Sequence, residues 1–320
     1  MSRQSDPIYN QRPPASPVHL SSSILMRSGS SGAVQQAALK NPMGQDMELL
    51  EIKFELSGAD NITLTNLSGY AQVFGGAIWC ELNMGGFPLT NGAIPVWNFG
   101  RAENLAGEIK TQNFGVSFLS YSWRLPRPLF IPAGAVVVPR FVHTGYIPDT
   151  VNVRIGYSCR TVFTKPKKIY LPWVAKYASK VINPVSSVLV DSSTELDLVN
   201  PHKEELYLQR FVGRTMTVEP VAPAGGRENG DNEVTNRYLT LRIRDSYGRP
   251  VVKDFTPFRS VFEASTRSWE MDNGACLDPE SYYIVEMKKI DTVSVGSDTT
   301  SSLQTFISMV GWREVDGSAI

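Results

Sequence analysis

One stretch of this sequence occurs twice, and such a repeat restricts the fold more than any single motif does. Residues 123–138 read WRLPRPLFIPAGAVVV and residues 269–285 read WEMDNGACLDPESYYIV, so Trp123 corresponds to Trp269 and Pro132 to Pro279. Neighbouring stretches repeat in the same order: Glu48–Phe54 with Glu205–Phe211, Pro88 with Pro250, Pro95 with Pro257, and Arg160–Val162 with Arg313–Val315. We interpret this as an ancient tandem duplication. Each unit has roughly 110–120 residues, which is enough to bury a core of its own.

Alternation of apolar and polar residues predicts short strands in both units. Leu50, Ile52, Phe54 and Leu56 alternate with charged residues, and Val151–Cys159 shows the same period. This is the pattern of half-buried strands in an antiparallel sandwich. We therefore predict an all-β chain with two tandem sandwiches, at residues 47–163 and 204–320. Residues 1–46 are rich in proline and serine and are expected to form an N-terminal arm. Residues 164–203 are expected to form a bridge.

The bridge shows the spacing of an amphipathic helix. From Pro172 to Pro184 the apolar residues fall on one face and the lysines on the other. A lysine-rich amphipathic helix suits an anionic membrane surface. The alternative, which we favour, is that its apolar face packs beneath the two sandwiches. The candidates for a membrane or inner-face contact are Lys165, Lys167, Lys168, Tyr170, Trp173, Lys176, Tyr177 and Lys180.

The charge and the reactive residues exclude several classes of function. Lys+Arg and Asp+Glu both total 31, which argues against a protein that neutralises nucleic-acid phosphate. The three cysteines include no CxxC pair, so we expect free buried thiols in a reducing compartment. The start of the chain has no apolar segment of a signal peptide, and no apolar run is long enough to span a bilayer.

No arrangement of residues predicts catalysis or a cofactor. His19, His143 and His202 lie far apart in sequence, and no metal-binding spacing joins them. No nucleophile elbow or phosphate loop is present. Weak candidates for calcium ligands are Asp231, Glu233 and Asp272, although turn chemistry explains the same residue types. We therefore predict a protein that is not an enzyme and needs no cofactor.

The internal repeat, the arm, the bridge and the neutral charge together resemble a known family. The chain resembles the double jelly-roll major capsid proteins of tailless icosahedral viruses with an internal membrane. The resemblance rests on the repeated pairs Trp123/Trp269, Pro132/Pro279, Pro88/Pro250 and Pro95/Pro257. Within that lineage the short units resemble the corticovirus and Finnlakevirus bacteriophages. The resemblance implies two jelly rolls, made in the host cytoplasm and placed in the virion shell. It also implies homotrimeric, pseudo-hexagonal capsomers that contact neighbouring capsomers, a vertex penton protein and membrane lipid, without sequence-specific nucleic-acid binding.

Two other classes of function stay open at this stage. A tandem β-sandwich binding module, such as a carbohydrate-binding or phage attachment protein, would need an exposed aromatic patch. Trp79, Trp97 and Tyr121 are the candidates, although they would serve equally well as core residues. An enzyme built on paired jelly rolls, such as an amidase or an oxygenase, would need converging carboxylates or histidines. Fold alone does not decide between these possibilities.

Overall fold

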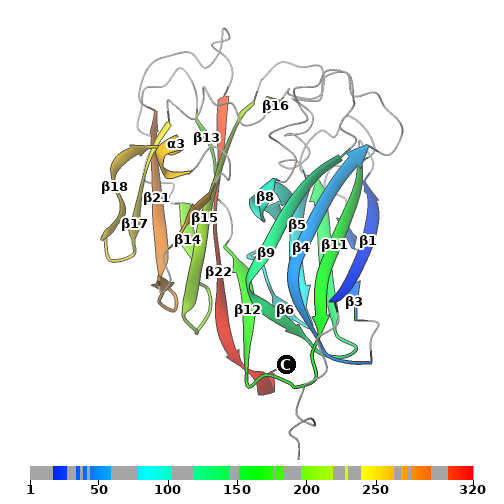
Figure 1. Cartoon of the computed structure of the whole chain (residues 1–320). Coiled ribbons are helices and arrows are strands. Elements are labelled where there is room, and N and C mark those ends of the chain that lie inside the picture. The colour runs from blue at the N-terminus through cyan, green and yellow to red at the C-terminus, as the bar shows by residue number, and fades with distance from the viewer. Residues whose placement is uncertain are drawn as a thin grey trace, which may run out of the picture.

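Two β-sandwiches stand side by side, and the strands run roughly upright in both (Figure 1). The computed structural model describes residues 17–26, 34–36, 39–41, 44–58, 78–102, 118–143, 151–175, 178–182, 196–218, 228–229, 239–262, 268–271, 275–289 and 302–319, and all structural statements below refer to these. Among these residues, no helix has the length and apolar character to cross a membrane.

The first sandwich consists of two antiparallel sheets. One has the order β1-β11-β4-β9-β8, and the other has the order β2-β10-β5-β6, with β3 added beside β10 and β7 beside β5. Aromatic residues from both sheets meet in the core, where the ring of Phe54 lies 6.3 Å from that of Phe141. In chain order the strands are β1 (Pro17–Met26), β2 (Val34–Gln36), β3 (Leu39–Lys40), β4 (Met47–Gly58), β5 (Ile78–Met84), β6 (Phe87–Pro88), β7 (Ile94–Pro95), β8 (Arg101–Ala102), β9 (Phe118–Ile131), β10 (Val136–His143) and β11 (Val151–Thr161).

The second sandwich repeats this plan. One sheet has the order β12-β22-β15-β16, with β13 beside β22 and both β19 and β20 beside β15, and the other has the order β14-β21-β17-β18. Phe211 of the first of these sheets packs on Tyr283 of the other, with ring centroids 5.4 Å apart. The elements are β12 (Lys168–Val174), β13 (Ala178–Ile182), β14 (Leu196–Val199), β15 (Leu206–Val218), β16 (Glu228–Asn229), β17 (Leu239–Asp245), β18 (Pro250–Pro257), α3 (Phe258–Val261), β19 (Ser268–Glu270), β20 (Cys276–Leu277), β21 (Tyr282–Lys289) and β22 (Ser302–Asp316).

Both sandwiches have the strand order of a jelly roll. In the first, the sheet β1-β11-β4-β9 places the first strand, β1, beside the last strand, β11. The strands β4 and β9 follow in the same sheet. In the second, β12, β22, β15 and β19 take the same places, and β14-β21-β17-β18 matches β2-β10-β5-β6. The chain is therefore a double jelly roll, as the resemblance predicted.

The strand register confirms the repeat and corrects its alignment. Trp123 lies opposite Ile52 of β4, and Trp269 lies opposite Phe211 of β15, so the two tryptophans are equivalent. A β-bulge follows Leu49 in β4 and Leu208 in β15. Counted from this bulge, Glu51 corresponds to Arg210, Ile52 to Phe211 and Glu55 to Arg214. The alignment of Phe54 with Phe211 was therefore wrong by two residues.

Part of the predicted arm is a strand of the first sandwich. β1 runs antiparallel to β11 from the pair Pro17↔Arg160 to the pair Met26↔Val151. Ile24 and Met26 belong to the core, while Ser21 and Ser23 point outward. The serines fit because they alternate with the inward residues, so a polar composition concealed a period-two pattern.

The predicted bridge helix is wrong, because two strands occupy this part of the chain. β12 pairs with the end of β22 from Lys168↔Asp316 to Val174↔Val310, and β13 pairs with the same strand from Ala178 to Ile182. Pro172 suited the start of a helix, yet a proline is equally tolerated on an edge strand, where its missing N–H is not needed. β12 pairs with β22 alone in its sheet, so it is such an edge.

Gly311 is expected to be required by the bulge in β15. A Cβ atom built on Gly311 would lie 2.3 Å from the Tyr207 carbonyl oxygen, which is backbone and cannot rotate away. We expect Gly311→Ala to cost about 3 kcal/mol of unfolding free energy, the upper part of the range for overpacking. Thermal or urea denaturation would measure this. Gly156→Ala is the matched control in β11, since its Cβ would meet only the Lys53 Cβ, at 3.8 Å. Equal stability of the two variants would contradict the prediction.

Candidate functional site

The candidate site is the interface between the two sandwiches, which we call the seam. Val212 of β15 and Phe306 and Val310 of β22 point away from the core of their own sandwich. They belong instead to the apolar cluster of the first sandwich, and each has an exposed fraction of 2% or less. The apolar core is therefore continuous from one sandwich to the other, and the two are packed as one body.

A short turn of the first sandwich fills the seam. The 3-10 helix η2 (Val96–Asn98) follows Pro95, and all three of its residues are buried. The Trp97 ring meets the Phe306 ring edge-on, with centroids 5.4 Å apart. The Asn98 side-chain Nδ2 donates a hydrogen bond to Ser308 Oγ at 2.8 Å. The turn is thus positioned by both an apolar and a polar contact with β22.

Two arginines of β15 bind the backbone of this turn. Arg214 Nε donates to the Trp97 carbonyl at 3.0 Å, and its Nη2 donates to the Gly100 carbonyl at 3.4 Å. Arg210 Nη2 donates to the Phe99 carbonyl at 2.8 Å. Carbonyl oxygens at these positions supply the partial negative charge that a buried guanidinium requires.

Aromatic rings and burial complete the environment of these arginines. The Arg214 guanidinium carbon lies 5.5 Å from the centre of the Trp97 ring and 5.9 Å from that of Tyr121, both within the range of a cation–π contact. Burial lowers the pKa of Arg210, as does the charge of Arg214, while Glu270 acts in the opposite direction. An arginine stays protonated under these conditions. The seam therefore contains two fixed positive charges.

The strand that connects the sandwiches makes a second contact across the seam. At its end, the Val174 N–H donates to the Leu89 carbonyl at 3.1 Å, and the Asn91 N–H donates to the Val174 carbonyl at 2.9 Å. Lower down, Arg127 of β9 lies over the rings of Tyr170 and Trp312, at 5.6 and 6.0 Å. The second sandwich is thus attached to the first along the length of β12.

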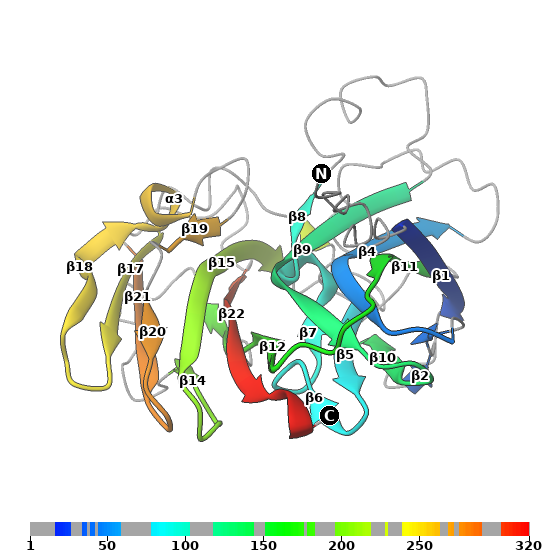
Figure 2. The ribbon, with the colours of Figure 1, turned by 60° about the horizontal axis from the view of Figure 1, so that its bottom comes forward.

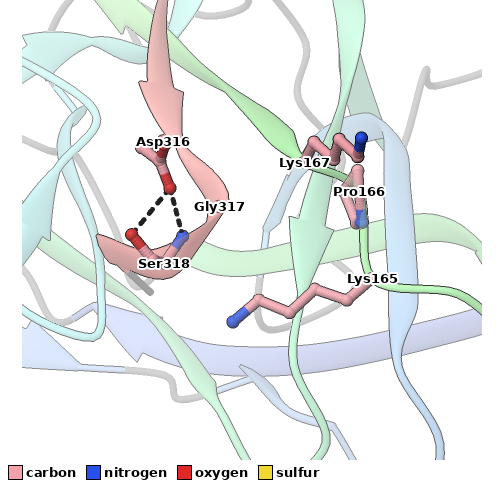
Figure 3. A pocket seen from close by; sticks show the side chains of 6 residues that line it. All are labelled: Lys165, Pro166, Lys167, Asp316, Gly317 and Ser318. Carbon is pink, nitrogen blue, oxygen red and sulfur yellow. Dashed lines mark hydrogen bonds between the residues drawn. The ribbon is translucent and has the colours of Figure 1, made fainter.

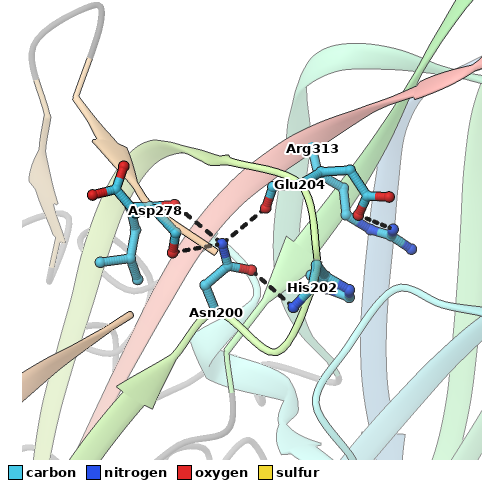
Figure 4. Close-up of polar contacts among 6 residues, drawn as sticks. Asn200, His202, Glu204, Asp278 and Arg313 are labelled. Atoms are coloured by element: carbon cyan, nitrogen blue, oxygen red, sulfur yellow. Dashed lines mark hydrogen bonds and ion pairs between the residues drawn. The ribbon is translucent and has the colours of Figure 1, made fainter. Parts of the chain in front are cut away.

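A polar cluster lies at the base of the second sandwich (Figure 4). The Asn200 side chain is completely buried, and its Nδ2 donates to the carbonyls of Glu204, Leu277 and Asp278 at 3.0–3.1 Å. Its Oδ1 accepts a hydrogen bond from the His202 backbone N–H at 3.1 Å. This single side chain therefore fixes the loop before β15 to the turn before β21.

His202 is held as a neutral imidazole in this cluster. Its ring packs edge-on against Trp173 at 4.3 Å, and within the described part of the chain its Nε2 has no hydrogen-bond partner. Burial lowers the pKa of His202 to about 4, and the nearby Arg313 contributes to the shift, while Glu204 opposes it. Arg313 in turn forms an ion pair with Glu204 at 3.0 Å.

Stability should decrease as the pH falls below the ordinary pKa of histidine. An unfolded chain binds a proton at His202 near pH 6.5, whereas the folded protein binds it only near pH 4. The stabilisation is therefore complete above pH 6.5 and is lost as the pH falls through 4. We expect His202→Leu to reduce the loss of urea resistance between about pH 7 and about pH 4.5. An equal loss in both proteins would contradict this role of His202.

A shallow hollow of about 410 Å³ lies where the linker meets the end of the chain (Figure 3). It is lined by Lys165, Pro166, Lys167, Asp316, Gly317 and Ser318. The Gly317 N–H donates to the Lys167 carbonyl at 2.8 Å, and Asp316 Oδ1 accepts from the Ser318 N–H and hydroxyl at 2.7 and 2.6 Å. These hydrogen bonds from Ser318 lower the pKa of Asp316. The end of β22 is thus attached to the linker between the sandwiches.

The predicted membrane-facing residues do not share one face. Lys165, Lys167 and Lys168 are exposed at the base, and Lys168 forms an ion pair with Glu314 at 2.5 Å. Tyr170 is half-buried beneath Arg127, and Trp173 is buried against His202. Lys180 lies in β13, while Lys176 and Tyr177 fall outside the described residues. The predicted helix would have placed the lysines on one face, whereas successive residues of a strand point to opposite faces.

The other predicted sites are only partly tested. Asp231, Glu233 and Asp272 lie outside the described residues, so calcium binding there stays a prediction. In the part of the chain that the structure describes, no group of three His, Cys, Asp or Glu residues could hold a metal ion. Cys80 and Cys159 are buried free thiols, whereas Cys276 is exposed, contrary to expectation.

The predicted aromatic patch of a binding module is wrong at two of its three positions. Trp97 and Tyr121 are each 1% exposed and contribute to the seam, while Trp79 is half-buried. The seam arginines, by contrast, were not predicted. The sequence carries one signal of a second covered face, because the apolar Val212 stands between Arg210 and Arg214 on the face that alternation assigns to solvent.

Comparison with known proteins gives structural likenesses only. No family model and no curated protein matches the sequence. Among solved structures, the chain is similar to PBCV-1 VP54 as fitted into a reconstruction of the virophage Sputnik (8% identity, 96% of this chain and 97% of that chain, TM-score 0.49). It is also similar to the PBCV-1 virus capsid (9%, 96% and 96%, 0.48) and to Sulfolobus Turreted Icosahedral Virus (12%, 92% and 90%, 0.49).

These three neighbours are viral structures. None of the three is a corticovirus or a Finnlakevirus, so that finer placement stays a prediction. Their TM-scores lie below 0.5 and their identities below 25%, and we infer neither the fold nor the function of this chain from them. The function has to be inferred from the seam and the surfaces of the chain itself.

Proposed function

We propose that this chain is a major capsid protein, a structural subunit of an icosahedral virion shell. The seam is the observation that supports this proposal most directly. Arg210, Arg214 and η2 fix two jelly rolls of the same strand order in one relative orientation. A rigid pair of equivalent building blocks suits a closed symmetric assembly, because each copy then offers the same surfaces at the same angle.

The duplication gives a reason for a trimeric capsomer. Three copies of a single sandwich would form a triangle, whereas three copies of a double one place six similar sandwiches around the axis. Such a pseudo-hexagonal unit could tile a flat facet and meet other copies and a vertex penton protein at its rim. Edge strands of the sandwiches would be covered by these neighbours, which removes a hazard of unwanted pairing.

The base of the molecule is the end that we assign to the virion interior. Short turns join the strands there, and Lys165, Lys167 and Lys168 are exposed beside the described end of the chain. The strands β4, β13 and β21 finish at the opposite end of the sandwiches, which we assign to the outside. The three lysines would then face an internal membrane, where anionic lipid headgroups attract basic residues.

A binding module is the second candidate function, and the buried Trp97 and Tyr121 argue against its simplest form. The structural role also needs neither a cofactor nor an active site. The first test is the native mass of the purified protein by light scattering. We expect a species of about three times 35.4 kDa, or larger shells visible by electron microscopy. A monomer at every concentration tested would overturn the proposal.

A further inference from the structure

The seam covers a sheet face in the second sandwich whose equivalent in the first sandwich is bare. Arg214, Phe306 and Ser308 on the covered face are each exposed by 2% or less. Their equivalents by register are Glu55, Arg154 and Gly156. The side chains of Glu55 and Arg154 are 40% and 58% exposed. On the outer face of the β1-β11-β4-β9 sheet, which we call the bare sheet, the equivalents of two covered residues are therefore exposed, although Ser120 beside Glu55 is buried.

The turn η2, which packs on the covered face, has an equivalent in the second sandwich, the short helix α3. Pro95 caps η2 with φ −53° and ψ 134°, and Pro257 caps α3 with φ −53° and ψ 132°. Counted from these prolines, Trp97 corresponds to Arg259 and Asn98 to Ser260. Phe99 packs on Phe54 at 5.1 Å, and Phe262, which is one residue further from its proline than Phe99, lies against Gly213, the residue that takes the place of Phe54. Both turns are thus anchored in the same way on their own sandwich.

The outer side of the second turn is partly exposed. Trp97 and Asn98 are buried in the seam, whereas Arg259 is half-buried and Ser260 is exposed. α3 and the bare sheet lie at opposite ends of the molecule in both views of the chain (Figures 1 and 2). A turn at one end and its matching sheet at the other can meet only between two copies.

The cation lies on the sheet in the seam, whereas it lies on the turn in the pair formed by the bare sheet and α3. In the seam the sheet provides the cation Arg214 and the turn provides the Trp97 ring and carbonyl. On the bare sheet the same position holds Glu55, which cannot donate to a carbonyl and already forms an ion pair with Arg154 at 3.6 Å, and on the bare turn the Trp97 position holds Arg259. Within the described residues Arg259 forms no ion pair, and a guanidinium is the natural partner of a carboxylate.

We propose that the turn Phe258–Phe262 of one copy docks on the outer face of the β1-β11-β4-β9 sheet of a second copy, with Arg259 paired to Glu55. The contact is head-to-tail, so it repeats the seam between chains and closes into a ring if the angle allows. The inference deepens the proposed function, since it names the surfaces by which copies associate.

Charge reversal tests the pair directly. Glu55→Arg and Arg259→Glu should each raise the concentration at which the assembly dissociates by about tenfold or more, because like charges then face each other. The double variant should restore the native mass at a given concentration. Lys203→Glu, an exposed change at the base, is the control and should assemble like the original chain. Circular dichroism and a melting curve would show that each variant is folded.

The outcomes separate this inference from the proposed function. An original chain that never assembles overturns the capsid proposal itself. An original chain that assembles while both single variants assemble equally well overturns only the docking contact. Single variants that dissociate without rescue in the double variant also overturn the pairing of Arg259 with Glu55.

Cross-linking tests the head-to-tail direction independently. Glu55→Cys and Arg259→Cys would be prepared separately in a Cys276→Ser background, then mixed before assembly and treated with a short bis-maleimide. We expect covalent dimers in the mixture and none in either variant alone. Dimers from one variant alone would indicate a twofold contact and overturn the proposal. No dimer in the mixture would also overturn it. Lys203→Cys mixed with Glu55→Cys is the matched control.

Discussion

Replacing Arg214 by methionine is expected to lower the unfolding free energy by roughly 3 kcal/mol, because the seam loses charged hydrogen bonds that nothing else can supply. Methionine keeps most of the apolar volume beside Trp97 and Tyr121, so the change removes mainly the guanidinium. The carbonyls of Trp97 and Gly100 then stay buried and lose these donors. A buried carbonyl without a partner is costly, since folding has already removed it from water.

The same variant should weaken the coupling between the two sandwiches. With the seam intact, calorimetry should show one transition, because neither sandwich can unfold without exposing the apolar surface of Val212, Phe306 and Val310. In Arg214→Met we expect the transition to broaden or separate into two. Arg154→Met is the control, since Arg154 is an exposed strand residue of the first sandwich and should change stability by only about 0.5 kcal/mol. A similar small effect in both variants would show that the arginine is not important to the seam.

The strands of both sandwiches were predictable because period-two alternation and a repeated order of tryptophan and prolines are local features of sequence. The equivalence of Trp123 and Trp269 survives in the register of the strands. The alignment of β4 with β15 was wrong by two residues. Both strands contain a phenylalanine, Phe54 and Phe211, and the bulge that sets the register has no sequence marker. A better marker was present but not recognised: the pair Asn-Pro occurs at 41–42 and at 200–201. The backbone N–H groups of Asn41 and Asn200 make equivalent hydrogen bonds, to the carbonyls of Ala135 and Ser281.

The bridge and the seam failed for a different physical reason. The segment from Pro172 to Pro184 fits a helix by spacing, but β22 offers β12 and β13 a long edge to pair with, and tertiary pairing overrides a weak local preference. The seam depends on which outer faces of two sandwiches meet, and a strand pattern says only that a residue faces in or out. Arg210 and Arg214 look like solvent-facing residues by alternation. Arg214 is buried and the Arg210 side chain is only 11% exposed, because the first sandwich covers this face.

Asn200→Ala is expected to cost about 3 kcal/mol, because one fully buried amide joins four backbone groups of the second sandwich. Its Nδ2 is shared among the carbonyls of Glu204, Leu277 and Asp278, and its Oδ1 accepts from the His202 N–H. Alanine leaves all four without this partner, in a site too closed for bulk water to replace it. Urea denaturation at neutral pH would measure the loss.

Asn200→Asp separates hydrogen bonding from volume. The carboxylate keeps the size and the acceptor but cannot donate, and it places a negative charge against three carbonyl oxygens. We expect it to be at least as destabilising as alanine. Asn41→Ala tests the equivalent amide of the first sandwich, which donates to the Gln45 and Pro132 carbonyls and should also lower stability. If Asn200→Asp were as stable as the original chain, the amide donors would contribute little, and packing alone would hold the base of the sandwich together.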